Sequence, residues 1–356
     1  MKKTGIVRIG IVGTGIWANN HAENYSHIRG VRLAACCDVD ATRARAFARR
    51  HGIERVYTDY AAMLADAPID AVDVVTTDAM HAEIAIAALK RRLHVMCEKP
   101  LATTVADARA MLRAARRARV IHMVNFTNRN SSALHKASRL IALGRLGQIR
   151  HVEAGYMQSW LVSNAWGDWR KDPAWLWRLS TAAGSGGVLA DVGCHILDFA
   201  AYAVGDISSL SCVLKTFDKG VGRKYKGYTL DANDSAVITA SFANGALGTI
   251  RCTRWAAGHL NTIYLHVFGT KGALKINLDE GRDRLMVCLG KDVHTAAWRP
   301  IQCGPGKTNY RRFIDSIRSG RNEGPTFADG LRIQQYLDAC RRSSDNAAEV
   351  RVRPLA

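Results

Sequence analysis

The sequence predicts an α/β fold in two domains, the first built on a parallel sheet and the second on a large, mainly antiparallel open sheet. In the first domain, short apolar runs alternate with helical segments, a rhythm typical of parallel strands joined by right-handed crossovers. After Asn125, strand-like stretches follow one another through tight turns, and Asn244-Gly245 is a strong hairpin signal. We therefore expect domains at 1–124 and 125–356, with a final helix at 327–343 that can pack back on the first domain.

Composition limits the classes of function. With 48% hydrophobic and 23% charged residues, the chain has the composition of a soluble globular protein, and no run approaches the roughly 18 apolar residues of a membrane helix. Nine cysteines without a C-x-x-C pair suit a reducing cytoplasm. The net charge is +19, and basic residues cluster at 43–50, 90–92 and 113–119, all on predicted helices. Apart from Phe47, these clusters contain no aromatic residues, so we expect solvated helix faces rather than a nucleic-acid surface. An anionic cofactor or substrate remains compatible with this charge.

A glycine-rich turn joins the first strand to the first helix. The apolar run 7–12 is followed at once by a G-x-G-x-x-A pattern that opens a helix. The first glycine permits a tight turn, the second lets the backbone approach a pyrophosphate, and the small third residue packs helix on strand. The helix N-terminus faces the phosphates. The pattern predicts a dinucleotide-binding Rossmann domain that holds its ligand through Gly13, Thr14, Gly15, Ile16 and Trp17.

An acidic residue ends the second predicted strand. Asp38 follows the run 32–37 and stands about 20 residues after the glycines, where a carboxylate can accept a hydrogen bond from the adenosine ribose. A carboxylate repels a 2′-phosphate, which favours NAD, whereas nearby Arg43 keeps NADP open. The alternative interpretation of Asp38 is a helix or turn cap.

Polar residues also follow the later strands. In the stretch 96–102, Met-Cys-Glu-Lys-Pro-Leu-Ala, the proline must end a strand because it cannot donate to a sheet ladder. In open parallel sheets, ligands bind beyond the carboxyl ends of the strands. An ordinary surface pair is the alternative for the Glu-Lys dipeptide. We expect the cofactor crevice to be lined by Thr76, Thr77, His81, Glu98, Lys99 and Asn125.

The second domain carries an acid and a histidine on one predicted helix, 186–204. Asp191 and His195 are four residues apart, which stacks them on one helix face, and Ser185-Gly186-Gly187 allows a close backbone approach. Histidine titrates near neutral pH and suits a general base, while a lysine ammonium can hydrogen-bond a developing alkoxide. A helix-surface or capping role is the alternative for the pair. No third ligand is spaced for zinc, so no metal is expected.

Taken together, these motifs resemble the Gfo/Idh/MocA oxidoreductases, the family of glucose–fructose oxidoreductase and inositol dehydrogenase. The resemblance spans nearly the whole chain and rests on the glycine turn, Glu98-Lys99-Pro100, Gly186-Gly187-x-x-x-Asp191-x-Gly193-x-His195-x-x-Asp198 and Gly269-x-x-Gly272. It implies a Rossmann domain followed by an open-sheet α/β domain. It also implies that Lys99, Asp191 and His195 form the catalytic and substrate-binding trio. Two departures are Arg92 and Arg119, which stand where relatives often place glycine past a helix end.

The function expected from the residues and the resemblance is NAD(P)-dependent hydride transfer between nicotinamide and a sugar, cyclitol or related polyol. A glycosidase that uses NAD for transient oxidation and a non-catalytic nucleotide- or sugar-sensing regulator are the alternatives. The resemblance also suggests a homodimer or homotetramer. We expect the uncovered face of the second sheet, around Ile238, Ile250 and Leu265, to form the contact between subunits.

Five of the eight tryptophans fall in one predicted loop between residues 160 and 177. Loops bury few residues fully, so this density is hard to assign to a core. Sugar rings pack their C–H faces on indoles, and Arg178 can bond the hydroxyls. We expect Trp169, Trp177 and Arg178 to bind substrate with the trio, or the loop to pack on another subunit. The Lys99-Pro100 bond is expected to be cis, a geometry that the resemblance implies.

Overall fold

The computed structural model describes residues 5–355 and divides the chain into two compact units. The first comprises the chain up to Thr127 together with 307–334, and the second comprises 128–306 and the residues from Gln335 on. The sequence interpretation assigned only the last helix, and not the segment from 307, to the first unit.

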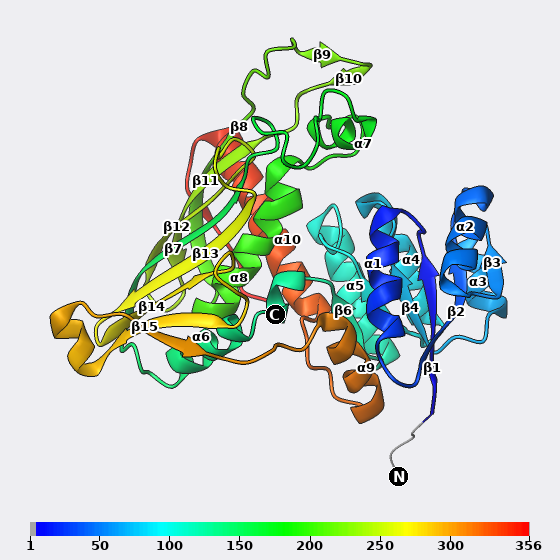
Figure 1. Ribbon diagram of the computed structural model, residues 1–356, viewed down its shortest axis with the longest axis horizontal. Helices are drawn as coiled ribbons and strands as arrows, with labels where there is room; N and C mark the ends of the chain where they lie inside the picture. The colour runs from blue at the N-terminus through cyan, green and yellow to red at the C-terminus, as the bar shows by residue number, and fades with distance from the viewer. Residues whose placement is uncertain (1–4, 356) are drawn as a thin grey trace. The chain divides into compact units, whose positions relative to one another are not determined.

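The first unit is a parallel six-stranded sheet between helices (Figure 1). The strand order β3-β2-β1-β4-β5-β6 is that of a dinucleotide-binding Rossmann sheet, as predicted. The strands are β1 (Val7–Val12), β2 (Val31–Cys37), β3 (Arg55–Tyr57), β4 (Ala71–Val74), β5 (His94–Cys97) and β6 (His122–Val124). The helices are α1 (Ile16–Ser26), α2 (Ala41–His51), α3 (Tyr60–Asp66), α4 (His81–Lys90), α5 (Val105–Ala118) and α9 (Asn309–Ser319).

Local signals place these helices. Asp40, Asp59 and Thr104 cap α2, α3 and α5 by accepting from backbone N–H groups, which satisfies donors that a helix start leaves open. Arg92 and Arg119 adopt the left-handed backbone expected there, at φ 58° and 55°. Helix α9 completes the unit because its Tyr310, Phe313 and Ile314 join the apolar core around β1 and α1.

The second unit is a nine-stranded mixed sheet of order β16-β15-β14-β13-β7-β12-β11-β8-β17. The pairing is antiparallel except between β7 and β12, which run parallel. Its strands are β7 (Ile149–Gln158), β8 (Ile207–Lys215), β11 (Ser235–Phe242), β12 (Leu247–Thr253), β13 (Asn261–Gly269), β14 (Gly272–Asn277), β15 (Arg284–Leu289), β16 (Arg299–Gln302) and β17 (Val350–Arg351), with a separate hairpin of β9 (Lys224–Tyr225) and β10 (Tyr228–Thr229). The helices are α6 (Ser132–Ala142), α7 (Pro173–Leu176) and α8 (Cys194–Val204), and α10 (Phe327–Asn346) continues into this unit from the first.

One face of this sheet is covered by α6 and α8 (Figure 1). Ile238, Ile250 and Leu265 point to that covered face and are buried, so the expectation that they lie on the open face is wrong. Side chains alternate along a strand, and here the apolar set is the one that faces the helices. The open face instead carries the opposite set, including Val213 and Val237, which pair across β8 and β11.

Candidate active site

The glycine turn between β1 and α1 can receive an anionic ligand. Gly13 has φ 91°, and a side chain there would collide with the backbone at Val75, so only glycine permits the turn. Around Gly15 the described residues leave open space. The first turn of α1, from exposed Ile16 and Trp17, contains no acid, and no side chain among residues 5–355 caps it. Helix N–H groups therefore face the place where a pyrophosphate would bind.

Asp38 lies beside this turn and is strongly hydrogen-bonded. It accepts from Thr14 N and Oγ1, at 2.8 and 2.9 Å, and from the backbone N of Asp40 at 3.0 Å. Arg43 adds a bidentate pair at 2.6 and 3.0 Å. Burial would raise the pKa of Asp38, but the bonds from Arg43, Asp40 and Thr14 hold it well below its usual range. The residue is an anion at neutral pH, which fits a ribose hydroxyl, and its pairing with Arg43 opposes use of that arginine for a 2′-phosphate.

The turn after β5 carries Lys99, and its bond to Pro100 is cis, as expected. Glu98 is buried and its Oε2 accepts from the backbone N of Lys99 at 3.2 Å. His81 is buried as well, with its Nδ1 2.9 Å from Pro100 O and its Nε2 3.2 Å from Thr76 O. His81 thus ties the proline turn to the end of β4, whereas Thr77 is exposed.

Three residues expected at the cofactor differ from that expectation in their burial. The side chains of His81, Glu98 and Asn125 lie inside the first unit and bond to protein groups, including Glu98 Oε1, which accepts from Asn125 Nδ2 at 2.7 Å. The sequence places Glu98 and Asn125 directly after strands and His81 in the first turn of a helix, and the structure agrees. It does not show that their side chains turn inward, because that depends on partners far along the chain.

Asp191 and His195 lie in the second unit on a helix that is not uniformly α. Residues Leu189–Gly193 form a π-helical turn that runs directly into α8. The predicted α-helical stacking of residues four apart therefore does not apply at Asp191, since a π turn is wider; such turns are frequent at functional sites. Asn233, which sequence reasoning missed, orders the turn by accepting from Leu189 N through its Oδ1 (3.0 Å) and from Val188 N through its backbone O (2.7 Å).

Arg254, also missed from the sequence, holds Asp191. Its side chain is buried, and its Nη2 donates to Asp191 Oδ2 at 3.0 Å. Its Nη1 donates to the carbonyl of Arg178 at 3.0 Å, and its guanidinium lies 4.8 Å from the centre of the Trp160 ring. A single arginine at the end of a strand gives no motif, so only the fold reveals this link.

The tryptophan-rich segment forms a small core of its own, contrary to the expectation of a loop that buries little. Trp160 and Trp169 are buried with Leu161, Leu176, Leu179 and Leu230. Trp177 is 41% exposed, with the Arg178 guanidinium 4.7 Å from its ring centre. Of the two tryptophans expected at the substrate, Trp169 is therefore a core residue and Trp177 is the accessible one.

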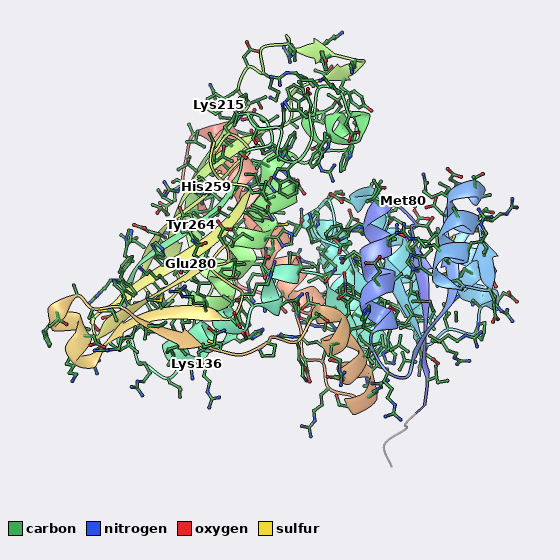
Figure 2. The ribbon with its side chains drawn as sticks, in the orientation of Figure 1. Met80, Lys136, Lys215, His259, Tyr264 and Glu280 are labelled. Atoms are coloured by element: carbon green, nitrogen blue, oxygen red, sulfur yellow. The ribbon has the colours of Figure 1, made fainter. Side chains whose placement is uncertain are left out.

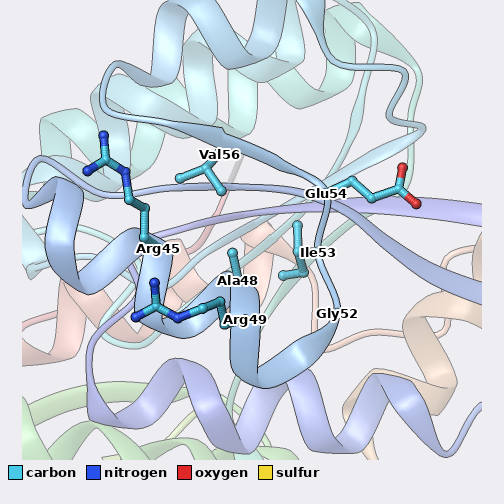
Figure 3. A pocket seen from close by; sticks show the side chains of 7 residues that line it. All are labelled: Arg45, Ala48, Arg49, Gly52, Ile53, Glu54 and Val56. Atoms are coloured by element: carbon cyan, nitrogen blue, oxygen red, sulfur yellow. The ribbon is translucent and has the colours of Figure 1, made fainter.

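A shallow hollow elsewhere in the first unit is unrelated to these residues (Figure 3). It lies against α2 and β3 and is lined by Arg45, Ala48, Arg49, Gly52, Ile53, Glu54 and Val56. None of the predicted site residues lines it.

The fold and the glycine turn define a dinucleotide-binding oxidoreductase. Residues 7–126 match the oxidoreductase family with an NAD-binding Rossmann fold, and residues 134–275 match the Gfo/Idh/MocA C-terminal domain. The chain belongs to the Gfo/Idh/MocA oxidoreductase family, which confirms the predicted family, fold class and NAD cofactor.

Several known proteins resemble the chain along nearly its whole length. It is 30% identical to myo-inositol 2-dehydrogenase of Thermotoga maritima, over 97% of this chain and 98% of that one. It is 29% identical to levoglucosan dehydrogenase of Pseudarthrobacter phenanthrenivorans, over 94% and 95%. A levoglucosan dehydrogenase complex with NADH and levoglucosan superposes with a TM-score of 0.87 at 28% identity, covering 98% and 100%. An oxidoreductase domain protein from Kribbella flavida superposes with a TM-score of 0.89 at 32% identity, and the match covers 98% of this chain and 100% of that one. Among residues 5–355, no helix combines the length and apolar character needed to span a membrane.

Proposed function

We propose that the chain is an NAD-dependent dehydrogenase that oxidises a secondary hydroxyl of a cyclic sugar or cyclitol, and reduces the ketone in reverse. The relatives are named for such substrates: levoglucosan, myo-inositol and apiose. The observation that carries the proposal is the Asp191–His195 segment, where a π turn and a buried arginine hold an acid that lies four residues before a histidine. A sensing module has no need of such a placement.

The proposed mechanism assigns one role to each residue. Gly13, Gly15 and the start of α1 bind the pyrophosphate, and Asp38 accepts from the adenosine ribose. Bound NAD would supply the acceptor for the hydride of the carbinol carbon. His195 takes the hydroxyl proton as general base, and the Lys99 ammonium donates a hydrogen bond to the developing alkoxide. Asp191 orients the substrate hydroxyl, because Arg254 fixes the position of its carboxylate.

Substrate recognition is proposed to involve the exposed part of the tryptophan-rich segment. Trp177 offers an apolar ring, and Arg178 beside it offers donors to hydroxyl groups. This pairing suits a neutral, ring-shaped polyol, which has one apolar face and several acceptors. Trp169 supports the segment from inside.

We also propose that the open face of the second sheet joins two subunits. Val213 and Val237 pair across neighbouring strands and are 66% and 56% exposed. Tyr264, labelled in Figure 2, lies over Gly155, where a side chain would collide with its ring, and its hydroxyl accepts from Arg251 Nε at 2.7 Å. This makes a partly apolar surface of the kind that oligomers bury.

The proposed location of the protein is the cytoplasm. The nine free cysteines support this, because a reducing compartment keeps thiols unpaired.

The test is turnover of a substrate panel with NAD, followed by the absorbance of reduced nicotinamide. The panel contains levoglucosan, myo-inositol, apiose and glucosides. Net reduction that is lost in His195→Ala by on the order of 10² to 10⁴-fold supports the proposal. Glycoside cleavage without net reduction, or NAD binding with no turnover of any panel member, contradicts it.

A further inference from the structure

A charged network is buried in the first unit, below the carboxyl ends of three neighbouring strands. His21 on α1 stands at its centre. The His21 Nδ1 lies 2.8 Å from Asp73 Oδ2 on β4, and its Nε2 lies 3.1 Å from Glu98 Oε1 after β5. The side chains of His21 and Asp73 are wholly inaccessible, and that of Glu98 is nearly so.

The network continues toward α9. Asn125 Nδ2 donates to Glu98 Oε1 at 2.7 Å and to Tyr310 Oη at 3.1 Å. The ring of Tyr310 meets the His21 ring edge-on, with centroids 4.9 Å apart. Three strand ends and two helices are therefore joined through His21 and its immediate partners.

The chemistry of the partners fixes the state of the His21 ring. Both ring nitrogens face carboxylate oxygens, which can only accept, so the ring donates from both nitrogens as an imidazolium. Burial alone would lower the pKa of His21, but Asp73 and Glu98 outweigh burial and raise it to about 10. For Glu98, burial would raise the pKa, but the bond from His21 and the charges of His21 and Lys99 lower it to about 2. Both contacts are thus charge-assisted hydrogen bonds, which are the strong kind.

Within the network, His21 and Glu98 connect to different parts of the first unit. His21 belongs to the helix that begins at the glycine turn, and Glu98 accepts from the backbone N of Lys99. We propose that His21 is a positioning residue for hydride transfer, which holds Glu98, and through it the Lys99 backbone, in register with helix α1. The inference rests on the proposed function, because it assigns His21 an effect on the step in which Lys99 acts.

The alternative is that the network serves only the stability of the fold. The two arms of His21 separate these possibilities, because only the Glu98 arm reaches Lys99. Asparagine carries its amide nitrogen near the position of the histidine Nδ1, and glutamine near that of Nε2. His21→Asn therefore keeps a donor for Asp73, and His21→Gln keeps a donor for Glu98.

The experiment compares these two variants in kcat, KM, NAD affinity and melting temperature. We expect both to melt earlier than the wild type. His21→Asn should lose on the order of 10²-fold in kcat, the scale of a small misplacement of a catalytic group, with KM and NAD affinity near wild type. His21→Gln should keep most of kcat. His122→Gln is the control: His122 Nδ1 accepts from the backbone N of Phe327 within the same unit, and glutamine carries no acceptor near the Nδ1 position. Loss of this bond should lower stability without changing kcat. Equal kcat in the two His21 variants overturns the inference.

A second pair of variants tests the inference if a His21 variant does not fold. Asp73→Asn and Glu98→Gln are the same isosteric change on the two arms, and only Glu98→Gln should lower kcat. If the wild type turns over no panel substrate, the proposed function fails, and crystal structures then test the inference by themselves. A displaced 97–100 turn in His21→Asn, but not in His21→Gln, supports it, and an unchanged turn in both contradicts it.

Discussion

The buried guanidinium of Arg254 donates to the carboxylate of Asp191 at 3.0 Å and, with its other nitrogen, to the carbonyl of Arg178 at the same distance. One side chain thus joins the π-helical turn to the tryptophan-rich segment within the second unit. Because Arg254 is buried, this bond holds Asp191 from inside the protein.

Replacing Arg254 with lysine should lower kcat/KM by about 10²-fold, since a misplaced catalytic group costs that much. Lysine keeps the charge but lacks the planar fork that reaches two acceptors at once. Steady-state kinetics on the best panel substrate checks this. Arg251→Lys is the control, because Arg251 lies on strand β12 three residues before Arg254 but bonds Tyr264 on the open face. Unchanged kinetics in Arg254→Lys would show that Asp191 does not depend on Arg254.

The two tryptophans expected at the substrate should respond differently to truncation. Trp177→Ala should raise the KM for the sugar and leave the melting temperature nearly unchanged, because Trp177 is exposed. Trp169→Ala should cost about 3–5 kcal/mol of unfolding free energy, the usual cost of emptying a buried aromatic site. Denaturant unfolding and kinetics on both variants measure these effects. If Trp177→Ala leaves KM unaltered, the substrate contacts lie elsewhere.

Cofactor choice should depend on the Asp38–Arg43 pair. Asp38→Ser removes the carboxylate that repels a 2′-phosphate and releases Arg43 to bind one. The ratio of kcat/KM for NADP to that for NAD should therefore rise by about one to two powers of ten. This corresponds to about 1.5–3 kcal/mol, the usual contribution of a hydrogen bond to a charged group. Asp38→Ser/Arg43→Ala should lose the gain in NADP use. A wild type that prefers NADP would refute the assignment.

Stability should vary with pH through His21 and Glu98. The folded-state pKa of His21 is raised from 6.5 to about 10, so its contribution is complete below pH 6.5 and is lost as pH rises toward 10. The folded-state pKa of Glu98 is lowered from 4.5 to about 2, so its contribution is complete above pH 4.5 and is lost as pH falls toward 2. The difference in unfolding free energy between wild type and His21→Gln should therefore shrink above pH 6.5. A difference that stays constant with rising pH would exclude a charged His21.

A charged residue on the open face of the second sheet should weaken the proposed contact between subunits. Val237→Arg places a cation opposite Val213 and near Arg251, so it should weaken self-association with little effect on the fold. Light scattering should give an oligomer for the wild type and a lower mass for the variant. A wild-type mass equal to the 39.0 kDa chain at micromolar concentration contradicts the proposed interface.

Local patterns predicted the elements that local chemistry determines. The glycine turn and the Asn244-Gly245 hairpin are present where the sequence indicates them. What the sequence did not reveal depends on distant partners. Arg254 reaches Asp191 only after the sheet forms, and His21 meets Asp73 and Glu98 only across three elements. The inward face of β11 and β12 could not be chosen from alternation alone, because it is set by the helices that cover it.

The return of residues 307–334 to the first unit has a consequence for the order in which the protein is made. Tyr310, Phe313 and Ile314 belong to the core around β1 and α1, yet the ribosome delivers them only after the whole stretch 128–306 has emerged. The core of the first unit therefore remains incomplete while the second unit is synthesised. A gene fragment that stops at the end of β6 would encode all six strands of its sheet and still lack part of its core, so it should yield an unstable product, whereas the same fragment fused to 307–334 should fold better.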